Sequence, residues 1–207
     1  MHPLYGMHTP FDVSVRTCET LFRLKKIPCR FKLIDAPEFL ELDKKLSEMG
    51  YALDAPAFLM SNPAVSVAPL NEEGIRSSVS PTREWIDFFV SHKKLGSTDT
   101  QTLRKILARI LPEKRFFWKI ENGSVVACVL AVYERGYTGL FDLFVDEAFR
   151  GKKHGLSLLR QALAEGAAKK HYKAYLQVDE NNRRAIGIYR ALGFEVAYRY
   201  WYRLRRD

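Results

Sequence analysis

The sequence of 207 residues contains little cysteine, and this scarcity limits the chemistry open to it. Its three cysteines, Cys18, Cys29 and Cys128, are far apart, and no Cys-x-x-Cys pair or Cys/His cluster with zinc spacing is present. The sequence therefore predicts neither a disulfide scaffold nor a metal site. Because Cys128 lies inside the apolar segment VVACVLAV, we expect it to be a small buried core residue.

Long hydrophobic runs are also missing. No apolar segment approaches the roughly 20 residues needed to cross a bilayer. The first residues, MHPLYGMHTPFDV, lack the basic start, apolar core and cleavage site of a signal peptide. We therefore expect a cytoplasmic protein without a membrane partner.

Acidic residues are too few to balance the basic ones beyond residue 70. Residues 1–70 hold eight Lys/Arg and eight Asp/Glu, so the whole net charge of +9 lies in the rest of the chain. A basic half can attract nucleic acid, an acidic membrane surface or a phosphorylated small molecule. Charge alone does not choose among these partners.

Two amphipathic helices are expected in the middle of the chain. Residues 82–95 carry apolar side chains at helical spacing, with Thr82 as the N-cap. Residues 99–111 repeat this pattern, with Asp99 as the N-cap.

Three antiparallel strands are expected next. The strands RFFWKI and SVVACVLAVYE flank Asn122-Gly123, a dipeptide that tolerates positive φ and favours a tight hairpin. The third strand is LFDLFV, and a helix, a strand, a second helix and a closing strand follow it. This order predicts an α/β (α+β) fold, with a mixed, mostly antiparallel sheet and flanking helices.

The first 60 residues follow the same plan as the end of the chain. FDVSVRTCETLFRLKKIPCRFKL matches GLSLLRQALAEGAAKKHYKAYLQV in its helix, Lys-Lys pair and strand. Gly50-Tyr51 then stands where Gly193-Phe194 stands, in each case after a second helix. Glycine and an aromatic residue after a helix are also common C-cap chemistry. Two matches in the same order favour a partial internal repeat.

A basic, glycine-containing loop separates an apolar strand from a leucine-rich helix in LFDLFVDEAFRGKKHGLSLLRQAL, residues 140–163. Backbone amides at a helix N-terminus form a site for an anionic phosphate group. By itself, the loop fits a solvated basic turn equally well. The first copy of the repeat lacks this loop, so we expect that copy to be structural.

A second motif, YLQVDENNRRAIGIYRALGF, decides between these interpretations. Together with RGKKHG it resembles the GNAT superfamily of N-acyltransferases, and the resemblance spans residues 82–205, about 60% of the chain. The family's loop reads (Q/R)-x-x-G-x-(G/A), which here falls on Arg150, Lys153 and Gly155. Lys153 departs from this pattern, because a glycine is expected there. The matching positions of the second motif are Asn182, Ala185, Tyr189, Gly193 and Phe194.

The resemblance implies direct transfer of an acetyl group from acetyl-CoA to a primary amine of a small molecule or peptide, in a ternary complex without a metal. The loop amides would bind the diphosphate at the positive end of the helix dipole. The backbone of Phe144 and Val145 would contact the pantetheine, and the Val145 amide would polarise the thioester carbonyl. The cofactor-binding residues implied are Phe144, Val145, Arg150, Gly151, Lys152, Lys153, His154, Gly155, Leu156, Asn182 and Tyr189.

The resemblance also implies catalytic roles. Tyr189 matches the family's general acid, since a phenol of pKa about 10 can protonate a departing thiolate; the alternative is that it only packs. Asn182 would hold the pantetheine or cap the following helix. Where some relatives carry a glutamate base, this chain has Gln177, which cannot take a proton. Asp142, a carboxylate within an apolar strand, is expected to be the base, through water, or to orient the amine. The competing role of Asp142 is structural.

A narrower resemblance concerns the organisation of the chain. The segments GLFDLFV and AYRYWYR resemble a bacterial GNAT subgroup with a degenerate N-terminal GNAT-like portion. We therefore expect a degenerate half in residues 1–65 and the catalytic domain in residues 66–207. The open sheet edge of the half would pack against the catalytic domain or against a second subunit in a homodimer.

Other functions stay open at this point. One is acetylation of a protein N-terminus, as by ribosomal-protein acetyltransferases. A second is a non-catalytic acyl-CoA-binding module, because Lys153 and Gln177 depart from the common patterns. Nucleic-acid binding by the basic, aromatic segment YRYWYRLRR is less favoured, because a last strand with two packed faces explains the segment as well.

Overall fold

The computed structural model describes residues 10–67 and 72–205. These residues form two compact units, and each unit combines segments that are distant in the sequence. The first unit contains the described residues up to Leu59, together with Val178–Ile186 and the chain from Val196 onward. The second unit contains the described part of Met60–Gln177 together with Gly187–Glu195. The predicted boundary between residues 65 and 66 stays a prediction.

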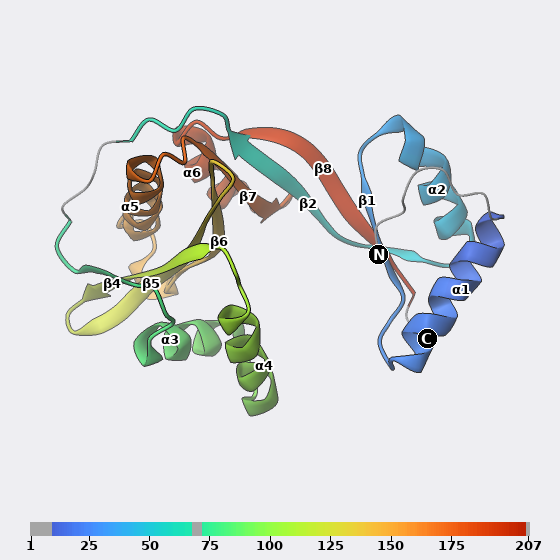
Figure 1. The fold of residues 1–207 in the computed structure, drawn as a ribbon, viewed down its shortest axis with the longest axis horizontal. Coiled ribbons are helices and arrows are strands. Elements are labelled where there is room, and N and C mark those ends of the chain that lie inside the picture. The colour runs from blue at the N-terminus through green and yellow to red at the C-terminus, as the bar shows by residue number, and fades with distance from the viewer. Residues whose placement is uncertain (1–9, 68–71, 206–207) are drawn as a thin grey trace. The chain divides into compact units, whose positions relative to one another are not determined.

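The second unit holds most of the sheet (Figure 1). Its strands are β3 (Ile75–Ser78), β4 (Glu113–Glu121), β5 (Ser124–Glu134), β6 (Tyr137–Val145) and most of β7 (Lys173–Asp179). Its helices are α3 (Arg83–Lys93), α4 (Ser97–Ala108), α5 (His154–Ala168) and the end of α6 (Arg183–Ala191). Strands β3 to β6 are antiparallel neighbours in chain order, and β7 pairs with β6 in parallel.

Two tight turns connect the central strands. Asn122 and Gly123 link β4 to β5 with φ of 51° and 77°. Arg135 and Gly136 link β5 to β6 with φ of 48° and 81°. Positive φ at both central residues matches the right-handed twist of the strands they join. The predicted meander of three strands is confirmed.

Helices cover both faces of these strands. Figure 1 shows α3 and α4 on one side of β4–β6 and α5 on the other. On the α3 side, the Trp85 ring lies 5.2 Å from Phe89 and 5.1 Å from Phe116, measured between centroids. On the other side, α5 buries Leu158 and Leu159. The buried position expected for the cysteine of β5, Cys128, is confirmed.

The ends of the two middle helices test the predicted caps. Thr82 caps α3, because its side-chain oxygen accepts a hydrogen bond from the Trp85 amide at 3.2 Å. Asp99 as the N-cap of α4 is wrong, since this helix begins at Ser97 with Gly96 as its cap. Asp99 instead lies in the first turn, where a negative charge still favours the helix dipole.

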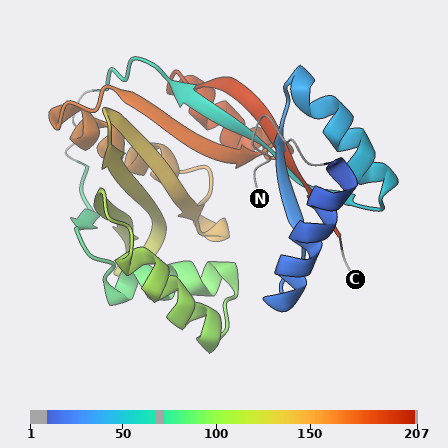
Figure 2. The same ribbon diagram turned by 45° about the vertical axis from the view of Figure 1, so that its right-hand side comes forward.

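The first unit is a smaller helix-and-strand layer. It contains α1 (Phe11–Leu24), β1 (Arg30–Ile34), α2 (Pro37–Glu48), most of β2 (Ala52–Asn62) and most of β8 (Glu195–Leu204). Figure 2 shows α1 and α2 on the same side of β1. The core between them is made of Val15, Cys29, Phe31, Leu33, Leu46, Tyr51 and Trp201.

The closing strand β8 uses both of its faces. Trp201 packs into the core of the first unit and donates a hydrogen bond from Nε1 to Asp43 at 2.6 Å. Tyr200 points the other way, and its ring centroid lies 3.9 Å from the Lys32 ammonium. The basic, aromatic sequence of this strand is thus explained by packing on two faces.

The complete strand order is β1-β8-β2-β7-β6-β5-β4-β3. The predicted fold class, a mixed and mostly antiparallel sheet with flanking helices, is confirmed. None of the described helices is long and apolar enough to cross a membrane.

Candidate active site

Strand β6 carries a bulge near its end. Phe141 pairs with Leu130 and Phe144 pairs with Cys128, so two residues of β6 face one residue of β5. Asp142 is the first of these two, and its backbone is left-handed, with φ of 55°. A bulge bends its strand and changes the direction of the residues that follow.

The parallel pairing of β6 with β7 stops just before this bulge. Among the described residues the register ends at the pair Leu140↔Leu176. Phe144 and Val145 therefore lie beyond the parallel ladder. Backbone groups that leave a ladder can pair with an extended ligand, as the sequence analysis expects for these two residues.

The loop after β6 passes through left-handed residues before α5 begins. Asp146 caps the short 3-10 helix η1 (Glu147–Phe149). Gly151 has φ of 88°, and Lys153, the N-cap of α5, has φ of 65°. The first backbone hydrogen bond of α5 runs from the Ser157 amide to the Lys153 carbonyl oxygen. The amides before Ser157 are therefore the ones that a helix N-terminus offers to an anion.

The conformation of Lys153 explains why glycine suits this position. A left-handed backbone is unfavourable for a residue with a Cβ by roughly 1–2 kcal/mol, whereas glycine adopts it freely. Lys153 keeps the left-handed turn and adds an exposed positive charge.

Gly155 brings the start of α5 against the end of β6. A Cβ at this position would lie 3.1 Å from Cγ2 of Val145 and 3.8 Å from the side chain of Leu143. The helix approaches the strand closely because Gly155 has no side chain. The helix N-terminus and the Val145 backbone are thus held next to each other.

The side chains of the loop are held by acids. Arg150 pairs with Glu147 at 2.9 Å. Lys152 lies 2.7 Å from Oε1 of Glu121, and Nε2 of the buried His154 lies 2.6 Å from Oε2 of the same carboxylate. The pKa of Glu121 is lowered, and the hydrogen bond from Lys152 is the largest cause.

Tyr189 is buried near the end of α6, and the helix C-cap fixes its surroundings. Gly193 has φ of 81°, and the Phe194 amide donates to the Tyr189 carbonyl oxygen at 3.0 Å. The buried Asn62 side chain donates to the Leu192 carbonyl oxygen at 2.9 Å and supports the same turn. Burial raises the pKa of Tyr189 to about 12. The phenol therefore keeps its proton near neutral pH.

Asp142 lies in a largely apolar setting next to one cation. Burial raises the pKa of Asp142, and the positive charge of Lys93 at the end of α3 opposes this shift. The Lys93 ammonium also lies 4.9 Å from the centroid of the Phe144 ring. A carboxyl group with a raised pKa takes up a proton more readily than an exposed one.

Asn182 orders the helix that follows it. Its side-chain oxygen accepts a hydrogen bond from the Ala185 amide at 3.1 Å, and its carbonyl oxygen accepts one from the Ile186 amide at 3.0 Å. The helix-cap role is therefore present, and a contact with pantetheine stays a prediction. Gln177 is exposed on β7, one residue past the end of the parallel register.

The sequence analysis missed two charged residues near the site. Glu121 reaches the loop from the end of β4, and Lys93 reaches Asp142 from α3. Neither belongs to a recognisable motif. The described residues contain no cluster of three or more His, Cys, Asp and Glu side chains that could hold a metal ion.

Comparison with known proteins supports the class of fold that this geometry defines. A crystal structure of a GCN5-related N-acetyltransferase from Kribbella flavida matches with a TM-score of 0.65 and 18% identity, and covers 94% of this chain and 75% of that one. A GCN5-related N-acetyltransferase from Sphaerobacter thermophilus has the same TM-score, with 17% identity over 89% of this chain and 63% of that one. Both likenesses concern the fold.

The family follows from sequence. The family model described as "Acetyltransferase (GNAT) family" matches residues 81–194. The chain therefore belongs to the GNAT acetyltransferase family, and this membership supports acyltransferase activity, in general terms that of an N-acetyltransferase. It is 25% identical over 169 residues to the uncharacterized N-acetyltransferase YobR of Bacillus subtilis (strain 168), across 80% of this chain and 68% of that protein.

Proposed function

We propose that this protein transfers the acetyl group of acetyl-CoA to a primary amine of a small molecule or peptide, by direct attack in a ternary complex. The observation that carries the proposal is the contact between Gly155 and Val145. It holds an anion-binding helix N-terminus beside a strand end that has left its parallel ladder. A ligand with a diphosphate at one end and an extended amide chain at the other fits such a pair.

The diphosphate of CoA would bind at the loop. The amides from Gly151 to Leu156 would donate to its oxygens, supported by the positive end of the α5 dipole. Arg150, Lys152 and Lys153 would add charge-assisted contacts. The pantetheine would continue along Phe144 and Val145, which places the thioester near the bulge.

The reacting groups would then divide the proton transfers. The Val145 amide would stabilise the thioester oxygen as negative charge develops on it. The attacking amine forms the new C–N bond, loses a proton to Asp142 through water, and expels the thiolate of CoA. Tyr189, protonated at neutral pH because its pKa is raised to about 12, would supply the proton for this thiolate.

Asp142 is the base that the surroundings favour. Its raised pKa suits the uptake of a proton, and Lys93 keeps part of its population ionised. Gln177 has no basic group. An alternative role, orientation of the amine by the Asp142 carboxylate, predicts the same loss of rate without a change in the pH profile.

A screen of amines, amino acids and short peptides, with free thiol as the readout, tests the proposal. We expect thiol release that depends on both acetyl-CoA and an amine. Acetylation restricted to peptide N-termini would favour the protein N-terminal acetyltransferase. Binding of CoA without release across the whole library would favour an acyl-CoA-binding module, and no calorimetric heat from CoA at millimolar concentration would refute every one of these functions. Retention on DNA that survives saturating CoA would instead support nucleic-acid binding.

A further inference from the structure

Glu121 contacts two residues of the diphosphate loop with its two carboxylate oxygens. Oε1 lies 2.7 Å from the Lys152 ammonium, and Oε2 lies 2.6 Å from Nε2 of His154. Glu121 is the last residue of β4 and pairs with Ser124 across the tight Asn122-Gly123 turn. A regular hairpin therefore carries this carboxylate to the loop.

The two partners of Glu121 differ in burial. The side chain of Lys152 is 53% exposed, whereas that of His154 is 7% exposed. An exposed ion pair contributes little because water screens it, but a buried polar group is destabilised when its partner is removed. The contact with His154 is thus the one that matters for the position of the loop.

Other groups around His154 favour the same arrangement. The Phe149 ring lies 6.3 Å from the imidazole ring, between centroids. Glu72 interacts electrostatically with His154 and is itself paired with Lys119 at 2.7 Å. His154 is thereby enclosed by two carboxylates and an aromatic ring, while its Nδ1 is buried without a hydrogen-bond partner.

His154 is also the first residue of α5, directly after the strained Lys153. A left-handed residue persists when its neighbours are held in place. Fixing the imidazole fixes the amides of the first turn, which are the groups that the diphosphate needs.

We propose that Glu121 is a positioning residue for acyl-CoA binding: through His154 and Lys152 it holds the diphosphate loop in its binding conformation. This inference rests on the proposed function, because it concerns the same ligand. Glu121 itself touches neither the reacting atoms nor the diphosphate.

The chain offers a matched control on the same strand. Glu113 stands at the other end of β4 and pairs with Lys169, just past the last residue of α5. Calorimetric titration with CoA should compare the unchanged protein with E121A, E121Q and E113A. We expect E121A to bind about tenfold more weakly, the effect of losing one charged hydrogen bond. E113A should stay within about twofold of the unchanged protein, and E121Q should fall between, because its amide oxygen still accepts one hydrogen bond.

Turnover provides a second readout. The KM for acetyl-CoA should rise in E121A while kcat stays within about twofold, since the chemistry is untouched. Unchanged or tighter CoA binding by E121A overturns this inference, and so does an equal loss in E113A. If E121A fails to fold, as judged by circular dichroism, E121Q decides: affinity equal to that of the unchanged protein, together with an unchanged KM, overturns the inference. Absence of CoA binding by the unchanged protein instead refutes the proposed function, so the two failures are distinguishable.

Discussion

The segments that end in β2 and in β8 have the same local structure but different chemistry. Their second helices, α2 and α6, end in the same turn, with φ of 84° at Gly50 and 81° at Gly193. In the first turn the amide after the glycine donates to the carbonyl oxygen of Leu46, and in the second it donates to that of Tyr189, both at 3.0 Å. Leu46 therefore occupies the position of Tyr189. It is equally buried but carries no hydroxyl group.

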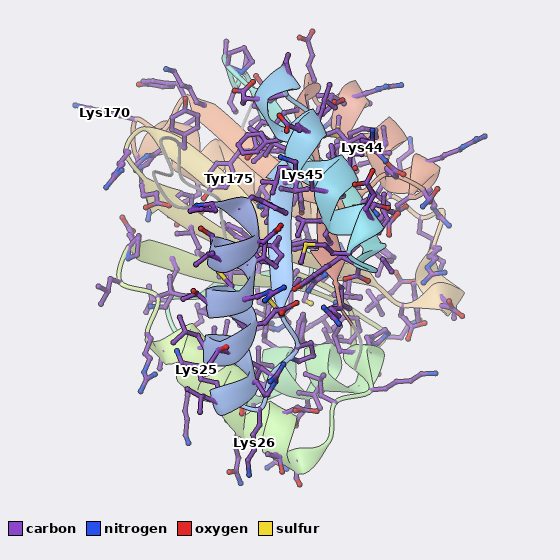
Figure 3. The ribbon with its side chains drawn as sticks, turned by 90° about the vertical axis from the view of Figure 1, so that its right-hand side faces the viewer. Lys25, Lys26, Lys44, Lys45, Lys170 and Tyr175 are labelled. Carbon is purple, nitrogen blue, oxygen red and sulfur yellow. The ribbon has the colours of Figure 1, made fainter. Side chains whose placement is uncertain are left out.

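The first helices of the two segments, α1 and α5, also end alike. Lys26 and Lys170 are left-handed, with φ of 54° and 67°, and each follows a second lysine. Figure 3 shows Lys25 and Lys26 at one end of α1. Counting back equally far from both turns places Phe11 where the other segment has Gly155. A phenylalanine cannot make the close approach that Gly155 allows.

The difference shows that the fold does not depend on the reaction chemistry. Both segments preserve glycine and lysine turns that end helices, because these turns determine the path of the chain. Only the second has the basic loop, the helix start without a side chain and the phenol. We therefore infer that the first segment is a structural copy. It is part of the fold, since the first unit contains β8 and the second contains the last residues of β2.

The largest effect should follow from giving the loop the residue of the first segment. In G155F, the side chain would collide with Val145, whose Cγ2 already lies 3.1 Å from a Cβ at this position. We expect CoA binding to fall by at least about a hundredfold, because the ligand-binding amides are displaced. Calorimetry measures this loss, with thermal unfolding as the check on folding. F11G is the reciprocal control and should leave CoA affinity unchanged; a loss as large as that of G155F would end the comparison.

The second effect concerns the hydroxyl group that Leu46 lacks. Y189F removes one oxygen and keeps the ring that packs 6.1 Å from Phe194. If Tyr189 is the general acid, kcat should fall by about a hundredfold while CoA affinity changes little. Steady-state kinetics with the amine identified in the screen measures it. Y133F, which removes the hydroxyl of another buried tyrosine, should keep full turnover; an unchanged kcat in Y189F would leave Tyr189 as a packing residue.

A smaller effect is expected at Asp142, on a strand that the first segment does not have. Burial raises the pKa of this carboxyl above its usual value of 3.8. A base must be deprotonated, so kcat/KM should fall as the pH drops through that raised pKa. D142N should lower kcat/KM about tenfold at neutral pH and abolish this acidic limb.

The same variant makes a prediction about stability. The folded chain binds the Asp142 proton more tightly than the unfolded chain does. Ionisation at neutral pH therefore weakens the fold, and the contribution of this group is largest at low pH. D142N should consequently unfold at the same or a higher temperature at pH 7. Full turnover of D142N at every pH would exclude the base role.

How far the sequence predicts the site depends on the range of the signal. The Asn122-Gly123 turn, the Thr82 cap and the glycine loop are local signals, in which a few adjacent residues determine the backbone. Asp99 was wrong as a cap because Gly96-Ser97 lies just ahead of it and starts the helix earlier.

Long-range features had no such signal. Glu121 is more than 30 residues from Lys152 and His154, and only the packing of α5 against the sheet brings them together. The left-handed backbone of Asp142 was also missed, since no glycine marks the bulge. Tertiary contacts impose that conformation on a residue that would not adopt it by preference.

The smallest effect compares one left-handed lysine from each segment. K153G and K26G should each relieve a strained backbone, with φ of 65° and 54°. The relief of roughly 1 kcal/mol is partly offset by the greater freedom of glycine in the unfolded chain. Chemical denaturation should therefore show both variants within about 1 kcal/mol of the unchanged protein. Their CoA affinities should separate them: K153G removes a charge at the loop and should bind about two- to threefold more weakly, whereas K26G should bind normally. Equal CoA affinities would mean that the Lys153 side chain adds nothing to the loop, and that glycine and lysine are interchangeable there.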